Sequence, residues 1–250
     1  MATPVELLVL AETKFVRKGT VPCSDSLHVI RIIDNQLWVC QRQKIEILDK
    51  NLKWLKVLHN KAWGHVYDVT LVPNAGIVIA CTNGLLNINS KGETMSVIDS
   101  GDFTSVDIYK GTLYASENET DTIYSYIYND GTFVNQGSSL LHRSGSSTIS
   151  VNNTITQCNS NSCMIDVSDM SGQQLYSYGR WGTKNAGNLQ CPKICQEDGE
   201  GTLLIADSKN HRLQLLDKCR AKWSIINLEP QLSCPRKAAY VDVALYVESG

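Results

Sequence analysis

The sequence predicts an all-β fold, a six-bladed β-propeller formed by one domain over residues 1–250. Apolar and polar residues alternate with a period of two along most of the chain, the pattern of half-buried strands, and no helical stripe interrupts it. The block 111–126 also aligns without a gap on the block that begins at residue 201. An internal repeat in an all-strand pattern is typical of propellers, whose blades hold about 40–45 residues.

The expected strands are short apolar runs bounded by Asn, Asp, Gly or Lys turns. In chain order, the clearest runs are 5–10, 14–18, 30–33, 37–40, 45–48, 77–81, 106–109, 122–128 and 213–216. Each run is only long enough for one strand of a blade. The chain therefore reads as a series of hairpins rather than as alternating strands and helices.

The blade number follows from the spacing of the apolar residue that opens the second strand of each unit. These residues are Leu37, Ile77, Leu113, Ile155, Leu203 and Leu245. Successive spacings are 40, 36, 42, 48 and 42 residues, and counting across the two termini from Leu245 to Leu37 gives 42. A period that continues through both termini predicts six blades in a closed ring.

The last unit, 235–249, holds only the first two strands of a blade. We expect the runs 5–10 and 14–18 to complete this blade and so to close the ring, which removes exposed strand edges. The alternative is that the N-terminal strand belongs to an unrelated element.

Composition excludes some classes of protein. Hydrophobic residues make up 42% of the chain, enough for a substantial core, and charged residues only 19%, which argues against disorder. No apolar run is long enough for a membrane helix. The N-terminal run carries Glu6 and no basic residue, so we interpret it as a strand rather than a signal peptide. We therefore expect a cytoplasmic protein without membrane contact.

The nine cysteines support the same compartment. Their number is odd and their spacing irregular, and Cys40 and Cys81 lie inside apolar strand patterns, where a thiol packs as a small hydrophobe. We expect mostly free thiols and no cofactor or bound metal. The alternative is a structural zinc site at the pairs Cys158/Cys163 and Cys191/Cys195, but no Cys-x2-Cys motif or paired His accompanies them.

One segment carries a family resemblance. Residues 179–192, GRWGTKNAGNLQCP, followed by 201–213, GTLLIADSKNHRL, resemble an NHL repeat, whose pattern is a glycine-spaced loop, a proline and an apolar run ending in Asp-Ser-x-Asn-His-Arg. The match is near complete here, partial at 111–126 and 235–249, and weak between residues 27 and 98. Leu189 stands where the family usually has an aromatic residue.

The resemblance implies a role and a local structure. NHL propellers typically form the C-terminal domain of tripartite-motif (TRIM) proteins, behind a RING, B-boxes and a coiled coil. No RING is present in these 250 residues, so ubiquitin-ligase chemistry is not expected in them. In the motif, we expect Asp207 to accept turn amides and to pair bidentately with Arg212. We expect Asn210 to take a left-handed conformation and His211 to pack within the turn.

Binding is expected on one face. In a propeller, the loops entering each innermost strand and those linking strands two and three surround one end of the central channel, and we call this end the entrance face. Loops on a rigid scaffold commonly bind partners, and exposed Trp and Arg are common anchors. The candidate binding residues are Trp63, Trp181, Lys193, Arg236, Lys237, Arg42, His28 and His65. For each tryptophan, the alternative is burial beneath its own loop.

We expect a non-catalytic, monomeric protein-interaction module that acts as a substrate-recognition platform. The alternative is a single-stranded RNA-binding propeller, because basic residues gather near Lys193 and Arg236 even though the net charge is −2. A metal-dependent propeller hydrolase or lyase is third. The five histidines show no metal spacing and no catalytic motif is present, and His28 and His65 are the one pair predicted near the channel mouth. No catalytic or metal-binding residue is assigned.

Overall fold

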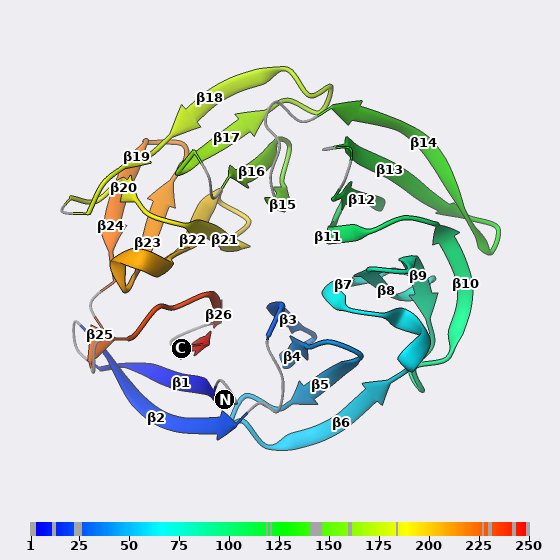
Figure 1. Cartoon of the computed structure of the whole chain (residues 1–250), viewed down its shortest axis with the longest axis horizontal. Coiled ribbons are helices and arrows are strands. Elements are labelled where there is room, and N and C mark those ends of the chain that lie inside the picture. Colours follow the sequence, from blue (N-terminus) through cyan, green and yellow to red (C-terminus); the bar gives the residue numbers. More distant parts are fainter. Residues whose placement is uncertain are drawn as a thin grey trace.

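The computed structural model describes residues 4–11, 14–22, 27–118, 120, 122–140, 147–159, 162–183, 185–226, 228–229, 232–241 and 244–248. These residues form almost only β-strands, and their sheets stand side by side around a central channel as the blades of a β-propeller (Figure 1). The all-β propeller expected from the alternation is therefore confirmed. Cys23 lies outside the described residues.

Five blades are four-stranded antiparallel sheets, each built from consecutive strands. The first holds β3 (Val29–Ile33), β4 (Gln36–Cys40), β5 (Lys44–Leu48) and β6 (Trp54–His59). The second holds β7 (Val66–Val72), β8 (Gly76–Cys81), β9 (Gly84–Ile88) and β10 (Thr94–Asp99). The third holds β11 (Phe103–Tyr109), β12 (Thr112–Glu117), β13 (Thr122–Asn129) and β14 (Thr132–Leu140).

The other two four-stranded blades follow the same plan. The fourth holds β15 (Ser147–Val151), β16 (Ile155–Asn159), β17 (Met164–Ser168) and β18 (Gln174–Tyr178). The fifth holds β21 (Pro192–Glu197), β22 (Thr202–Asp207), β23 (Arg212–Asp217) and β24 (Lys222–Ile225). In every one of these blades the first strand lies nearest the channel and the fourth lies at the rim (Figure 1).

The remaining large sheet differs from the expected sixth four-stranded blade. It has five strands in the order β25 (Leu228–Glu229), β2 (Lys14–Pro22), β1 (Pro4–Ala11), β27 (Ala244–Glu248) and β26 (Lys237–Val241). In it β1 pairs antiparallel with β27, with Val5 opposite Glu248. The extra strand is β25, which adds in parallel to the outer edge of β2. Both ends of the chain thus share one sheet.

The short elements lie in connections between blades. They are the 3₁₀ turns η1 (Lys61–Trp63) and η2 (Ser208–Asn210), and a parallel pair of two-residue strands, β19 (Arg180–Trp181) and β20 (Asn188–Leu189). Within the described part of the chain, no helix is long and apolar enough to cross a membrane.

The core fills the space between neighbouring blades rather than one central volume. The residues that gave the period, from Leu37 to Leu245, all lie in the second strand of their sheet and are buried. The five-stranded sheet also packs apolar residues against the blades on both of its sides. Tyr246 packs against Leu37 of the first blade, and Leu245 packs with Leu213 of the fifth.

The thiols belong to this core more than to any site. The eight cysteines in the described part of the chain are thiols rather than disulfides. Cys40 and Cys81 are fully buried in β4 and β8, as the apolar pattern around them predicts. Burial raises the pKa of the Cys81 thiol to about 11, so this thiol stays neutral and packs as an apolar group.

Candidate functional site

The innermost strands start at one end of the channel, and their first residues define the entrance face. These strands are β3, β7, β11, β15, β21 and β26, and each contacts the next around the channel, including β26 with both β21 and β3. Because all six run in the same direction through the ring, the residues just before or at their starts come together. The sequence separates these residues, and the topology gathers them.

Five basic side chains meet at this end, and we call them the mouth cluster: His28, Arg42, His65, Lys193 and Lys237. His28 and His65 directly precede β3 and β7, Lys193 and Lys237 lie at the starts of β21 and β26, and Arg42 lies in the β4–β5 loop. The Val66 amide donates to the Arg42 carbonyl at 2.6 Å, which joins that loop to the start of β7. The mouth cluster contains five of the eight residues predicted from sequence.

Aromatic rings pack around His28 within the cluster. Its imidazole stacks on that of His65 with ring centroids 5.7 Å apart and an interplanar angle of 30°. The Tyr67 ring meets it edge-on at 5.0 Å. His28 Nε2 is buried and has no hydrogen-bond partner among the described residues. The ring is therefore held by packing, with one nitrogen uncommitted.

The electrostatics of the cluster are those of crowded like charges. Burial, followed by the charges of Lys237, His65, Lys193 and Arg42, lowers the pKa of His28 to about 4. Burial and the charge of Lys193 lower the pKa of Lys237 to about 8, although Cys195, Glu248 and Asp68 oppose the shift. Both shifts disfavour the cationic form, as expected where positive groups share a partly desolvated space.

Trp63 does not lie on this surface, which corrects the prediction of an exposed anchor. It is 0% exposed and belongs to the apolar core between the first and second blades. The connection from β6 to β7 turns inward as η1, capped by the Asn60 side chain, which accepts a hydrogen bond from the Ala62 amide at 3.0 Å. The indole consequently fills the gap between blades, so the alternative of burial beneath its own loop holds.

Trp181 and Arg236 are exposed but occupy different places. Trp181 is 73% exposed and lies on β19, at the rim of the molecule and away from the channel (Figure 1). Arg236 is exposed immediately before Lys237 and the start of β26, beside the mouth cluster. Only Arg236 therefore extends the surface that the cluster forms.

The repeat motif shapes the β22–β23 connection. Asp207 is fully buried and accepts hydrogen bonds from Arg212 Nε at 2.9 Å and from the Gln190 amide at 2.6 Å. The Asp207–Arg212 ion pair is thus present but not bidentate. Arg212 Nη2 donates instead to the carbonyl oxygens of Asn185 and Asn188 in the preceding loop. The motif therefore also fixes the loop that contains Asn185 and Asn188 against the blade, a contact that the prediction of a simple β22–β23 hairpin pair did not include.

The left-handed residue of this turn is His211, with φ 54°, and not Asn210 as expected. Asn210 closes η2 and uses its side chain to donate to Asp207 and to the Gly182 carbonyl. His211 Nδ1 accepts a hydrogen bond from the Cys234 amide at 3.0 Å. His211 is accordingly a hydrogen-bonding residue of the turn.

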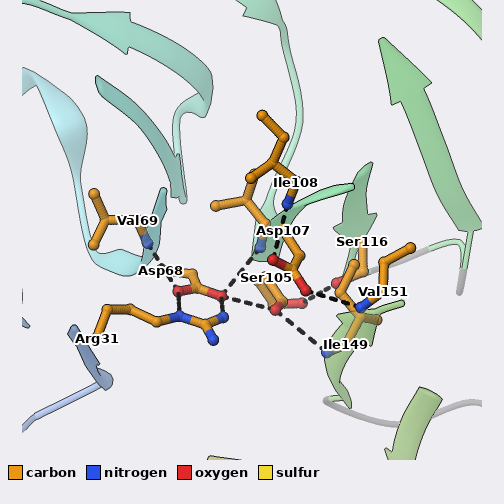
Figure 2. A network of polar contacts seen from close by, with 11 residues as sticks. Arg31, Asp68, Val69, Ser105, Asp107, Ile108, Ser116, Ile149 and Val151 are labelled. Carbon is orange, nitrogen blue, oxygen red and sulfur yellow. Dashed lines mark hydrogen bonds and ion pairs between the residues drawn. The ribbon is translucent and has the colours of Figure 1, made fainter. Parts of the chain in front are cut away.

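A polar network inside the channel was missed from sequence altogether. Asp68 on β7 is 1% exposed and accepts from both Arg31 Nε at 2.8 Å and Arg31 Nη2 at 2.6 Å. On its other side it accepts from the Ser105 hydroxyl at 2.8 Å and the Val106 amide at 3.1 Å (Figure 2). One carboxylate thus joins the inner strands of three blades. Nothing in the local pattern of HVYDVTL signals this role, because the partners lie 37 and 38 residues away.

The network continues to the fourth blade. Asp107 Oδ2 accepts from the Val151 amide at 2.8 Å, and the Ser105 hydroxyl accepts from the Ile149 amide at 3.3 Å (Figure 2). Burial raises the pKa of the Asp107 carboxyl, although the charge of Arg31 opposes the rise. These contacts replace the backbone ladder that adjacent blades lack, so their role is to hold the inner strands together.

A small polar cavity lies below the mouth cluster along the channel. Its volume is about 210 Å³, and its polar lining comes from Arg31, Thr70, Asp107, Ser150, Gln196 and Glu197. Arg31 is already paired with Asp68, and Glu197 with Lys218 at 2.6 Å. In the described part of the chain, no group of three His, Cys, Asp or Glu side chains is placed to hold a metal ion.

No protein-family model and no curated protein matches this chain. Solved structures do match it, at low sequence identity. A protein of unknown function from Bacteroides thetaiotaomicron is 10% identical, with a TM-score of 0.70 over 97% of this chain and 90% of that one. An auxiliary nutrient binding protein from the same organism is 12% identical, with a TM-score of 0.69 over 98% of this chain and 74% of that one.

Catalytically inactive virginiamycin B lyase from Staphylococcus aureus, with quinupristin, is also similar. It is 14% identical, with a TM-score of 0.63 over 98% of this chain and 81% of that one. These similarities show the β-propeller fold and no more, because propellers with this architecture serve unrelated functions. The resemblance to NHL repeats thus depends on the motif residues.

Proposed function

We propose that this chain is a non-catalytic binding module that recognises a protein partner through its entrance face. The observation that supports this most strongly is the mouth cluster, which gathers basic side chains from the first, second and fifth blades and from the five-stranded sheet at one end of the channel. Rigid inner strands fix these side chains, and the loops beside them are free to contact a partner. Arg42 and Arg236 are exposed next to this opening and extend it outward.

In this proposal the chain is one monomeric, NHL-like domain, and the five-stranded sheet is its sixth blade. The pairing of β1 with β27 would then close the ring. Two observations support the proposal. The innermost strand β26 contacts β21 and β3, the innermost strands of the fifth and first blades, just as the innermost strands of neighbouring four-stranded blades contact one another. The sheet also packs apolar residues against the fifth and first blades.

Two other functions have weaker support. Single-stranded RNA could use the same cations, but the net charge of −2 is not that of a typical nucleic-acid binder. The likeness to a lyase raises the catalytic alternative, yet the described residues lack a metal-binding group and the mouth cluster pairs bases with bases. A general acid–base site needs groups whose environments separate their roles.

The test is capture of partners by matched charge-reversal variants. Arg42→Glu with Arg236→Glu alters the entrance face, and Lys50→Glu with Lys91→Glu makes the same charge change in exposed turns of the opposite face. We expect the parent chain to capture a partner that survives nuclease treatment. The entrance-face variant should lose it and the opposite-face variant should keep it.

Equal capture by both variants would contradict the proposed surface. Loss of the captured partner on nuclease treatment would favour RNA instead, and binding should then weaken steeply with salt. Both variants must first melt like the parent chain, although the exposed positions make large stability effects unexpected.

A further inference from the structure

We propose that the mouth cluster binds a dianionic phosphate group, held by Lys193, Lys237 and Arg42 at the opening of the channel. This inference deepens the proposed function, because it names the chemical group that the entrance face recognises. It rests on how the fold arranges charge rather than on any one residue.

Among the described residues, Lys193, Lys237 and Arg42 of the mouth cluster have no ion-pair partner. The ion pairs in the described part of the chain include Arg31 with Asp68 and Lys218 with Glu197, and none of them involves Lys193, Lys237 or Arg42. The acids that act on Lys237 are Glu248, opposite it in the β26–β27 ladder, and Asp68. Asp68 is already neutralised by Arg31.

The mouth cluster carries more positive charge than the neighbouring acids neutralise. At neutral pH, below the pKa of about 8 of Lys237, the cations Lys193, Lys237 and Arg42 stand against the single charge of Glu248, which leaves about two positive charges concentrated at the opening. A phosphate monoester carries about −1.5 to −2 at neutral pH and offers three acceptor oxygens. Such a group would match the excess charge, whereas one carboxylate would leave part of it uncompensated.

A bound phosphate group would stay at the mouth of the channel, because the charges deeper in the channel are already paired. Arg31 and Asp68 lie three residues beyond His28 and His65 along β3 and β7, about 10 Å deeper at the usual rise of a strand. There Arg31 is balanced by Asp68, and further in Glu197 is balanced by Lys218 and Asp107 adds a carboxyl group. The excess positive charge is therefore confined to the opening, and an anion gains nothing by going deeper.

The mouth cluster also supplies hydrogen-bond donors for phosphate oxygens. Lys193 and Lys237 supply ammonium groups, Arg42 supplies a fork suited to phosphate oxygens, and the Nε2 nitrogen of His28 has no partner among the described residues. An anion in their midst would stabilise the cationic forms of His28 and Lys237, which the free protein disfavours. Binding should therefore raise the pKa of His28, which gives a readout independent of any partner.

The experiment is a titration of the full chain with orthophosphate, at ionic strength held constant with chloride. Calorimetry reports affinity and histidine-resolved NMR reports the pKa of His28. We expect saturable binding and a rise in that pKa. Arg42→Gln and Lys237→Met should each bind roughly tenfold or more weakly, as expected for loss of a charged hydrogen bond. Lys91→Gln, an equal charge change on the opposite face, should bind like the parent.

Absence of saturable orthophosphate binding would overturn the inference, as would equal affinity in the Arg42→Gln variant. Arg42 is exposed, so this variant stays informative even if Lys237→Met folds poorly. O-phosphoserine is the second probe: tighter binding than orthophosphate assigns the group to a phosphorylated side chain, and equal binding assigns it to a free phosphate compound. Tighter binding of oligouridylate than of either would replace the monoester by an RNA phosphodiester and so overturn the inference.

The two proposals fail separately. If orthophosphate does not bind but partner capture still depends on Arg42 and Arg236, the phosphate site is wrong and the binding surface stands. If orthophosphate binds but partner capture does not depend on Arg42 and Arg236, the phosphate site stands and the proposed binding surface for the partner is wrong.

Discussion

At the scale of single residues, buried charge does two different things in this channel. Asp68 is buried but receives hydrogen bonds from Arg31, Ser105 and Val106, so its charge joins blades. Lys193, Lys237 and Arg42 of the mouth cluster have no ion-pair partner in the described part of the chain, and burial together with neighbouring positive charge lowers the pKa of His28 and of Lys237. Satisfied buried charges are typical of structure, and crowded like charges in an opening are typical of sites that bind something.

The low pKa of His28 predicts acid sensitivity. The unfolded ring takes up a proton near pH 6.5, whereas the folded ring, which is partly buried and lies beside Lys237, His65, Lys193 and Arg42, does so only near pH 4. Its contribution to stability is therefore complete above pH 6.5 and is lost as the pH falls toward 4. We expect this group to contribute about 2 kcal/mol to the loss, discounted because the ring is partly exposed.

The measurement is the free energy of unfolding in urea at several pH values for the parent chain and for His28→Gln. The difference between the two should shrink as the pH falls from 6.5 to 4. His59→Gln, at the end of the rim strand β6 and exposed, is the matched control and should follow the parent. A difference that does not depend on pH would show that His28 titrates normally.

At the scale of elements, the strands were predictable and the connections were not. Runs such as 37–40, 77–81 and 213–216 are strands because each is a short, mainly apolar run bounded by turn residues, which suits a strand that is buried on both faces between blades. The connection containing Trp63 has no such run. Its indole is buried because it fills the space between two blades, and the sequence of the loop alone does not indicate that this space exists.

Trp63 and Trp181 should consequently respond differently to truncation. Trp63→Ala should cost about 3–5 kcal/mol of stability, because it empties a fully buried indole site between blades. Trp181→Ala should change stability by about 0.5 kcal/mol or less, since its ring is largely in solvent. Urea unfolding of both variants measures the contrast, and equal costs would place Trp63 outside the core.

At the scale of the whole molecule, the arrangement of the two chain ends matters most. β1 lies between β2 and β27 and supplies the ladder on one side of each. Without β1, the backbone of β27 would be unpaired on the side that now faces β1, and β27 would become an exposed sheet edge. Unpaired edges of this kind template aggregation.

Deletion of residues 1–18 should therefore cause aggregation or loss of cooperative unfolding. Light scattering and a thermal melt of the truncated chain are the measurements. As a control, a substitution such as Lys18→Ala, at an exposed position, should leave both unchanged. A truncated chain that stays soluble and melts like the parent would show that β1 and β2 are dispensable, and the proposed ring closure would fail.

The sequence by itself determined the class of fold, the positions of most strands, the repeat and the face on which basic residues collect. It could do so because strand periodicity and repeat spacing are local properties of the chain. The ladder partners of β1, the inward turn of Trp63 and the Asp68 network were decided only by the tertiary structure. Each depends on residues tens to hundreds of positions apart, and the closeness of such residues is fixed by how blades pack, not by the neighbours of any one residue in the chain.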